Sequence, residues 1–270
     1  MSVAAFKPYL DRWSLTPDGV EIVTRGSRLL PVRHKGKPAM LKVAVEIDEK
    51  WGWLLMEWWR GDGAARAMAR DGDALLLERA TGGRSLERMA REGEDDTASR
   101  IMCKVAARLH APRGSAPPDL IPLEQWFRDL WPAAERLGGV FASSAATARM
   151  LLAEPREVVV LHGDIHHGNI LDFGKRGWLA IDPKRLIGER GFDFANIFTN
   201  PDRSVAATPG RLGRQVEVIS EAARLEPTRL LQWIVAWTGL SATWHLQDGM
   251  EAESNVQIEI ARIAAAELDP

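Results

Sequence analysis

The chain has 270 residues, a formal net charge of −2 and a hydrophobic fraction of 46%, which is an ordinary balance for a protein with a substantial core. The slight negative charge argues against nucleic acid as the main partner, because phosphate binding requires clustered lysines and arginines. Cys103 is the only cysteine, and there is neither a secretory signal nor an apolar run long enough for a membrane span, so we expect a cytoplasmic protein without disulfides.

The N-terminal part of the sequence predicts a small, β-rich lobe. Turn residues around Gly26 and Gly36 separate three short apolar runs, which are expected to form an antiparallel meander over residues 20–23, 29–33 and 39–43. Acidic residues followed by apolar residues at helical spacing predict a helix over 46–60. A further short strand is predicted over 74–77.

After Gly83 the pattern becomes mainly helical. Helices are predicted over 85–91, 95–110, 123–137, 147–153 and from 211 onward, with a strand over 158–161 and a hairpin formed by 170–173 and 178–181. The sequence therefore predicts an α+β fold with two lobes. A small antiparallel β-rich lobe, residues 1–80, would precede a larger, mainly helical lobe, residues 81–270. Ligands often bind at such a joint.

The stretch LHGDIHHGNILDFGKRGWLAIDP, residues 161–183, carries the candidate chemistry. If residues 174–177 form the turn of the hairpin, Asn169 and Asp182 lie opposite each other at its open end, and Asp164 lies just before that end. Oxygen atoms of Asn and Asp suit magnesium, which prefers hard donors. A third carboxylate nearby can accept the proton of an attacking hydroxyl. The stretch therefore predicts phosphoryl transfer.

The histidines of this stretch allow another interpretation, a metal-dependent hydrolase built on His162, His166 and His167. The glycines at 163 and 168 argue against a helix there, and the metalloprotease motif H-E-x-x-H is absent. We therefore expect His162 to hold the loop through hydrogen bonds to the backbone. The eleven tryptophans are expected mainly in helix and core packing, with an aromatic ligand platform as the alternative.

The motif H-G-D-I-H-H-G-N resembles the H-R-D-x-x-x-x-N catalytic loop of kinases, with the same interval between Asp and Asn. Together with the tripeptide Ile-Asp-Pro, it resembles the aminoglycoside phosphotransferase family, in particular the branch of streptomycin 6-kinases and hydroxyurea phosphotransferases. The stretches ARLHAP, KRLIGERGFDFAN and GLSATWHLQDG also fit that branch, so the resemblance covers most of the chain. It implies a protein-kinase-like fold and transfer of the γ-phosphate of ATP to a small hydroxylated molecule such as streptomycin.

The resemblance also implies roles for individual residues in catalysis and metal binding. Asp164 would be the catalytic base, and Asn169 and Asp182 would bind magnesium. Asp182 stands where protein kinases place the aspartate of D-F-G, but here it lies in Ile-Asp-Pro and is not followed by Phe and Gly. The chain also lacks the G-x-G-x-x-G and A-P-E motifs, so no activation-loop switch of the protein-kinase type is expected. It also lacks the G-x-x-x-x-G-K-[ST] pattern of P-loop enzymes.

For ATP, the resemblance implies that Lys42 anchors the nucleotide and pairs with Glu49 on the following helix, with Glu46 as the second choice. The remaining contacts would come from the hinge, at Glu78 to Ala80, and from the first β-turn, at Gly26 and Ser27. Backbone groups of the hinge would contact adenine, and the first β-turn would cap the phosphates.

The acceptor implied by the resemblance is a cationic aminoglycoside, for which an acidic cleft in the helical lobe is expected. Its candidate residues are Glu189, Asp193, Asp248 and Glu251. Asp193 could instead anchor the catalytic loop or cap a helix over 194–198. We expect a monomer or a weak dimer. The alternatives are a choline, homoserine or fructosamine kinase, which share the catalytic loop, and a non-catalytic nucleotide-binding pseudokinase.

Overall fold

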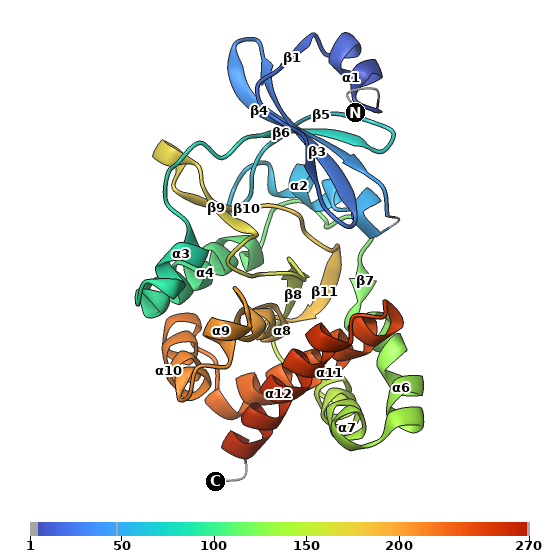
Figure 1. The fold of residues 1–270 in the computed structure, drawn as a ribbon, viewed down its shortest axis with the longest axis vertical. Helices are drawn as coiled ribbons and strands as arrows, with labels where there is room; N and C mark the ends of the chain where they lie inside the picture. Colours follow the sequence, from blue (N-terminus) through green and yellow to red (C-terminus); the bar gives the residue numbers. More distant parts are fainter. Residues whose placement is uncertain (1–4, 47, 269–270) are drawn as a thin grey trace.

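The β-rich part of the chain folds into one antiparallel sheet. The structure, a computed structural model, describes residues 5–46 and 48–268 (Figure 1). The six strands of the sheet have the order β1-β3-β4-β6-β5, with β2 paired to β3. The elements of this lobe are α1 Lys7–Arg12, β1 Leu15–Pro17, β2 Ile22–Val23, β3 Ser27–His34, β4 Lys37–Ala44, the 3₁₀ turn η2 Asp48–Lys50, α2 Trp53–Trp59, β5 Ala67–Asp71 and β6 Ala74–Glu78.

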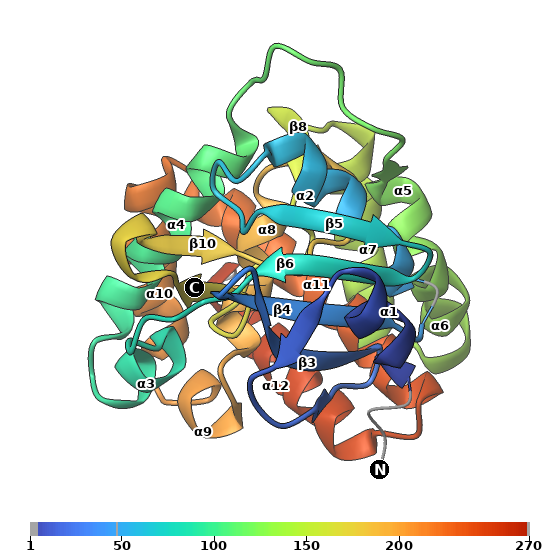
Figure 2. The same cartoon turned by 90° about the horizontal axis from the view of Figure 1, so that it is seen from above.

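β6 is buried on both faces of the sheet, which explains its uninterrupted apolar run. Successive residues of a strand point to opposite faces. Leu76 packs in a small core with Phe6 next to α1, whereas Leu75 and Leu77 belong to a larger core that includes Trp59 of α2. Seen from above, β3, β4, β6 and β5 lie side by side over the rest of the molecule (Figure 2).

The C-terminal part contains many helices and two small sheets. Its helices are α3 Leu86–Arg91, α4 Asp95–His110, α5 Leu123–Trp126, η3 Phe127–Asp129, α6 Leu130–Leu137, α7 Gly139–Ala153, η4 Gly174–Arg176, α8 Phe192–Ala195, η5 Asn196–Thr199, α9 Arg203–Ala206, α10 Arg211–Ala223, α11 Pro227–Gln247 and α12 Glu251–Leu268. Its strands are β7 Ile121–Pro122, β8 Val158–Leu161, β9 Ile170–Asp172, β10 Trp178–Ala180 and β11 Leu186–Glu189. β9 pairs with β10, and β11 lies between β7 and β8.

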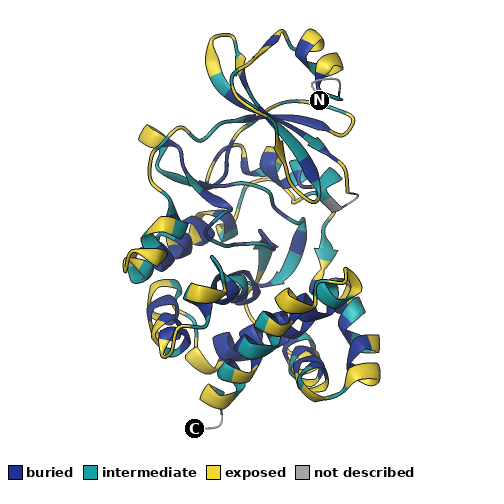
Figure 3. Cartoon of the chain, in the orientation of Figure 1, coloured by how far each residue is buried: buried dark blue, intermediate teal, exposed yellow. Residues whose placement is uncertain are grey.

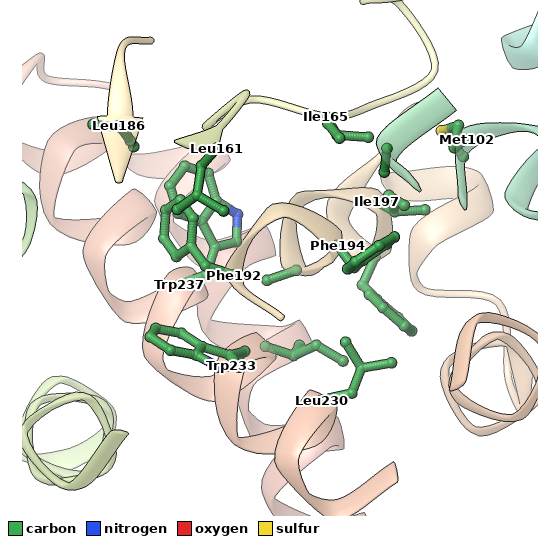
Figure 4. Packing of buried hydrophobic residues seen from close by; sticks show 14 of the residues in the cluster. Met102, Leu161, Ile165, Leu186, Phe192, Phe194, Ile197, Leu230, Trp233 and Trp237 are labelled. Carbon is green, nitrogen blue, oxygen red and sulfur yellow. The ribbon is translucent and has the colours of Figure 1, made fainter. Parts of the chain in front are cut away.

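α11 is the central helix of this lobe and is buried over most of its circumference, as its nearly continuous apolar sequence requires. It packs against α7, α8 and α12. Phe192 of α8 makes edge-to-face contacts with Trp233 and Trp237, at centroid distances of 5.7 and 5.5 Å. Figure 4 shows these rings in the core cluster that also contains Leu161 of β8, and Figure 3 shows the buried residues concentrated in the interior of both lobes.

The two-lobed α+β architecture agrees with the sequence-based prediction, and β8 and α4 have the predicted bounds. The division at residue 80 stays a prediction, since the larger core contains Leu75 and Leu77 together with the C-terminal helices. α1, β1 and β5 are absent from the prediction, and α7 begins at Gly139 instead of residue 147.

The helix predicted over 46–60 is shorter than expected, because the chain forms η2 and then α2. Gly52 lies between the two elements and packs against Pro183, where a Cβ atom would meet the Pro183 carbonyl oxygen at 2.7 Å. Residue 47, within the predicted helix, lies outside the described residues. None of the helices in the described part of the chain combines the length and apolarity needed to cross a bilayer.

The predicted register of the β9–β10 hairpin is wrong by one residue. Ala180 pairs with Ile170, and the backbone N–H of Ile181 donates to the Asn169 carbonyl at 2.9 Å, so Asn169 lies opposite Ile181 and not Asp182. The cause is the turn, because Phe173 and Gly177 are still hydrogen-bonded (2.8 Å) and only the three residues of η4 form the loop.

Candidate active site

A cavity of about 470 Å³ lies between the sheet and the C-terminal lobe. The sheet contributes apolar side chains, among them Leu29 and Met40, and the C-terminal lobe contributes Leu171 and Phe173 of the hairpin region. The predicted residues Ser27, Lys42, Glu49, Glu78, Ala80, Asn169 and Asp182 all line this cavity. It therefore brings together groups that lie far apart in the sequence, and its apolar walls suit a flat aromatic ligand.

Lys42 is the centre of a buried charge network. Its Nζ atom lies 2.5 Å from Oε2 of Glu49 and also contacts Oδ1 of Asp182, so the expected pair with Glu49 is present. The second choice, Glu46, pairs with Arg25 at 3.2 Å instead. Burial opposes the ionisation of Asp182, but Lys42 and Lys184 outweigh it and hold the pKa of Asp182 below its ordinary value.

The first β-turn approaches this network closely. Gly26 lies against Glu49, and a Cβ atom at residue 26 would meet Cγ of Glu49 at 2.5 Å. The Ser27 hydroxyl is buried in the described structure without a hydrogen-bond partner, and the residue lines the cavity. Gly26 therefore makes room for the glutamate, while Ser27 offers a free donor to a ligand.

The hinge is held by a contact from the β9–β10 turn. The Glu78 carboxylate pairs with Arg176, and the Glu78 N–H donates to the Arg66 carbonyl at 2.9 Å. Ala80 follows the end of β6 and lines the cavity. In the described structure its backbone forms no hydrogen bond to another backbone group.

His162 fixes the conformation of the loop that carries Asp164. Its Nε2 atom lies 2.8 Å from the Ile181 carbonyl, and its Nδ1 atom accepts the Asp164 N–H at 3.2 Å. Because a carbonyl only accepts and an amide only donates, the ring is neutral, with its proton on Nε2. Burial lowers the pKa of His162, although the nearby Asp193 and Asp164 oppose the shift. The predicted role of His162 in holding the loop is confirmed.

Asp193 is buried behind the same loop. Its carboxylate accepts the N–H groups of His162 and Gly163, at 2.8 and 2.6 Å, and lies 2.7 Å from Nε2 of His110. The side chain has no exposed surface. The assignment of Asp193 to acceptor binding is therefore wrong, because its carboxylate is fully occupied in anchoring the catalytic loop.

The other three acidic candidates do not form a cleft either. Glu189 is buried and bonds to Arg229 and Trp233, so its assignment to acceptor binding is also wrong. Asp248 pairs with Arg25, and Glu251 is exposed at the start of α12. The four acidic candidates therefore do not gather at one binding site. Three of them have a partner elsewhere in the protein, and Glu251 lies in solvent.

Asp164 is surrounded by two amides and one ammonium group. Asn196 donates to Oδ1 at 2.7 Å and Asn169 donates to Oδ2 at 3.1 Å. Nζ of Lys184 lies 3.8 Å from Oδ2. Burial disfavours the charged form of Lys184, but Asp164, Asp182 and Glu49 outweigh it and raise the pKa of this lysine. These contacts orient the Asp164 carboxylate and keep a positive charge beside it.

Asp164 lines a second cavity, of about 340 Å³. Aromatic and neutral polar side chains form most of its wall, from Trp126, His166, Asn196, Thr199, Asn200, Trp237, Ser241, Trp244, His245 and Gln257. Among the described residues that line it, Asp164 is the only carboxylate. Oε1 of Gln257 and Nε1 of Trp126 are buried there without hydrogen-bond partners. A buried polar atom left unpaired is costly, and a ligand can satisfy it.

Sequence reasoning missed Asn196, Lys184 and Gln257. Lys184 follows the Ile-Asp-Pro tripeptide directly, and this closeness to Asp182 is a signal that could have found it. Asn196 and Gln257 carry no such signal, since only the fold brings η5 and α12 to Asp164. The alternative of a histidine metal site gains no support, because the described residues contain no group of three or more His, Cys, Asp or Glu side chains that could hold a metal ion.

The chain matches a protein-family model and several known proteins over most of its length. A model of the aminoglycoside/hydroxyurea antibiotic resistance kinases matches residues 12–249. The streptomycin 3''-kinase of Klebsiella pneumoniae is 52% identical over 95% of this chain and 98% of its own length. The streptomycin 6-kinase of Streptomyces griseus is 31% identical over 95% of this chain and 87% of its own length.

Solved structures show the same fold at low sequence identity. An aminoglycoside phosphotransferase in a ternary complex with ADP and hygromycin B is 14% identical, covers 98% of both chains and has a TM-score of 0.67. A choline/ethanolamine kinase family protein from Mesorhizobium loti is 15% identical, covers 100% of this chain and 98% of its own, and also has a TM-score of 0.67. The fold is therefore kinase-like, and the chain belongs to the aminoglycoside/hydroxyurea antibiotic resistance kinase family.

Proposed function

We propose that the protein transfers the γ-phosphate of ATP to a hydroxyl of streptomycin, preferentially the 3''-hydroxyl. The observation that carries the proposal is the position of Asp164, which lines the aromatic second cavity and accepts a hydrogen bond from Asn169, a residue that lines the apolar nucleotide cavity. The choice of position rests on the relatives, since the 3''-kinase shares far more of its sequence with this chain than the 6-kinase does.

ATP would occupy the larger cavity. Its adenine would lie between the apolar walls and form hydrogen bonds with the backbone of Ala80, at the hinge that begins at Glu78. Its phosphates would lie near Lys42 and under the turn of Gly26 and Ser27. The free Ser27 hydroxyl and the Lys42 ammonium group support this orientation, because both offer donors to phosphate oxygens.

Asn169 and Asp182 fit a magnesium ion. Both line the nucleotide cavity, and the low pKa of Asp182 keeps its carboxylate ionised. Asn169 turns its NH₂ group to Asp164, so that its Oδ1 atom is without a hydrogen bond in the described structure. Two hard oxygen donors of this kind suit Mg²⁺. When bound, the ion neutralises charge on the phosphates of ATP.

The acceptor would enter the second cavity and present one hydroxyl to Asp164. Streptomycin carries guanidinium groups, and a guanidinium group stacks favourably on tryptophan faces such as those of Trp237 and Trp244. The free Oε1 of Gln257 can accept a hydrogen bond from the same kind of group. Recognition would thus depend on aromatic faces and neutral acceptors, instead of the acidic cleft expected from the sequence.

In the reaction, Asp164 accepts the proton of the acceptor hydroxyl. The hydroxyl oxygen forms a bond to the γ-phosphorus, the bond from that phosphorus to the bridging oxygen breaks, and ADP leaves with the electron pair. Asn196 and Asn169 hold the carboxylate in place, which leaves further acceptor positions on both oxygens for the hydroxyl.

The proposal predicts ATP consumption that depends on streptomycin and yields a 3''-phosphorylated product. Turnover would be measured by ADP release, and the position of the phosphate by NMR of the product. Asp164→Asn should lower turnover by roughly 10² to 10⁴, the usual contribution of a general base. Phosphorylation at the 6-position would overturn the regiochemistry, and no streptomycin-dependent turnover of the wild-type protein would reject this acceptor.

A kinase of this kind would act in the cytoplasm, where ATP is available, as a monomer or a weak dimer. Size-exclusion chromatography with light scattering measures the oligomeric state directly.

A further inference from the structure

The segment from Asp182 to Lys184 crosses from one cavity to the other. Asp182 and Pro183 line the nucleotide cavity, whereas Lys184 lines the acceptor cavity. The catalytic loop crosses the same boundary, with Asn169 on the nucleotide side and Asp164 on the acceptor side. A phosphoryl group that moves from ATP to the acceptor therefore passes between these two segments.

Lys184 is held firmly at this crossing. Its backbone N–H donates to the His162 carbonyl at 2.7 Å, and its side chain contacts Oε1 of Glu49. The catalytic loop packs directly on it, since a Cβ atom at Gly163 would lie 3.0 Å from Cβ of Lys184. The neighbouring residues Asp182 and Arg185 both have positive φ, 64° and 57°, an uncommon conformation that persists where surrounding structure enforces it.

The charge of Lys184 does not suit the acceptor. Lys184 is the single lysine or arginine among the described residues that line the acceptor cavity. A cationic acceptor gains nothing from a lysine beside its binding site, because like charges repel. An ammonium group 3.8 Å from Asp164 does suit the oxygens of a phosphoryl group in transfer, whose charge develops at this position.

Glu49 links this lysine to the nucleotide site. One oxygen of its carboxylate contacts Lys42, at 2.5 Å, and the other contacts Lys184. The two ammonium groups are thus spaced by a single carboxylate, with Lys42 in the nucleotide cavity and Lys184 in the acceptor cavity. In this arrangement the Lys42 ammonium group would lie beside ATP, and the Lys184 ammonium group would lie beside the phosphoryl group that is transferred from it.

We propose that Lys184 is a catalytic residue that binds the oxygens of the phosphoryl group during its transfer, while Lys42 binds the nucleotide before it. The inference rests on the proposed phosphotransfer at Asp164. As the acceptor oxygen bonds to phosphorus and ADP leaves with the electron pair, the Lys184 ammonium group stabilises the negative charge of the transferred group and keeps its own protons. The proton of the hydroxyl goes to Asp164.

The variant Lys184→Met tests this role. Turnover with ATP and streptomycin should fall by about 10²- to 10³-fold, the usual loss for one donor to a transition state, while the KM values change by less than about 3-fold. Lys184→Arg should recover part of the rate, since it restores a cation. Arg185→Met is the matched control, because it removes a cation from the next position, where Arg185 pairs with Asp119 at 3.3 Å, and it should retain full turnover.

A binding measurement separates this inference from the choice of acceptor. Aluminium fluoride with ADP and magnesium mimics a phosphoryl group in transfer, so it should bind wild-type protein much more tightly than ADP alone. Lys184→Met should lose most of this gain and keep its affinity for ADP. Lys184→Gln serves the same purpose if the methionine variant does not fold.

A gain with aluminium fluoride that is unchanged in the Lys184 variants would overturn the inference, and so would an equal loss of affinity for ADP, which indicates a structural role. If the wild-type protein does not phosphorylate streptomycin, the proposed acceptor is wrong, but the binding comparison still decides the role of Lys184.

Discussion

Among the polar side chains in and around this site, some form all their hydrogen bonds within the protein, whereas others have a buried atom without a partner in the described structure. The carboxylates of Asp193 and Glu189 accept several hydrogen bonds each and are buried. Oε1 of Gln257 and the hydroxyl of Ser27 are equally buried but unpaired in the described structure. Unpaired polar atoms that line a cavity are therefore better guides to ligand contacts here than the presence of a charge.

Gln257→Leu tests this view at the acceptor cavity. The variant should raise the KM for streptomycin by about 10- to 100-fold, since a hydrogen bond to a charged group contributes ~1.5–3 kcal/mol. Turnover at saturation and the KM for ATP should change little. The unfolding temperature should stay the same or rise, because the lost oxygen has no partner in the free protein.

The control is Gln215→Leu, since Gln215 bonds to Ser99 and Asp96 at 2.7 and 2.9 Å. That variant should lose stability without a change in the acceptor KM. An unaltered KM in Gln257→Leu would contradict a role for Gln257 in acceptor binding.

At the level of elements, β11 is joined to α11 by a buried ion pair. Glu189 accepts hydrogen bonds from Nε and Nη2 of Arg229, at 3.0 and 2.6 Å, and from Nε1 of Trp233 at 2.8 Å. Burial opposes the ionisation of Glu189, but these bonds outweigh it and hold its pKa below the ordinary value of 4.5. The contribution of the pair to stability is therefore present above about pH 4.5 and lost as the pH falls further.

Glu189→Gln should lower the free energy of unfolding by about 3–5 kcal/mol, because it leaves the Arg229 charge buried without a partner. Denaturant unfolding at pH 7 measures this change. At a temperature where the variant is folded, its KM for streptomycin should equal that of the wild type. If Glu189 bound the acceptor, its replacement would raise this KM. Glu259→Gln is the control, since it breaks an exposed pair with Arg203 and should cost less than about 1 kcal/mol.

At the level of the whole molecule, the two lobes contact each other at several places. The hinge after β6 connects them covalently, and Ala65 forms a backbone hydrogen bond to Ala180 of β10 at 2.9 Å. In addition, Arg25 in the first β-turn pairs with Asp248 at the end of α11. These contacts join the sheet to the helical lobe.

Arg25→Ala should weaken the contact between the lobes. Exposed ion pairs contribute at most about 1 kcal/mol, so the KM for ATP should rise by no more than about 5-fold, and salt should reduce the difference between variant and wild type. Steady-state kinetics at low and high ionic strength measures both effects. Arg33→Ala removes an arginine pair with Asp18 inside the small lobe and should leave the KM unchanged. A salt-independent change would show that Arg25 acts by another route.

The sequence by itself determined the local features of this protein. A continuous apolar run located β8, helical patterning located α4, and the shift from short strands to long helices predicted two lobes. The spacing of Asp164 and Asn169, with Asp182 after the hairpin, was enough to predict phosphotransfer. The same residues carry the resemblance to the family. These features are readable because they depend on residues close together in the chain, although the turn still shifted the hairpin register by one residue from the predicted one.

The tertiary structure decided which of the charged residues are free to bind a ligand. Glu189 and Asp193 look like any other acids in the sequence, and only the packing of Arg229 and of the catalytic loop against them removes them from the acceptor site. Packing also placed Gln257 of α12 in the cavity that Asp164 lines, although nothing in the sequence connects the two residues. Burial and pairing are properties of contacts between remote segments, so spacing along the chain does not contain them.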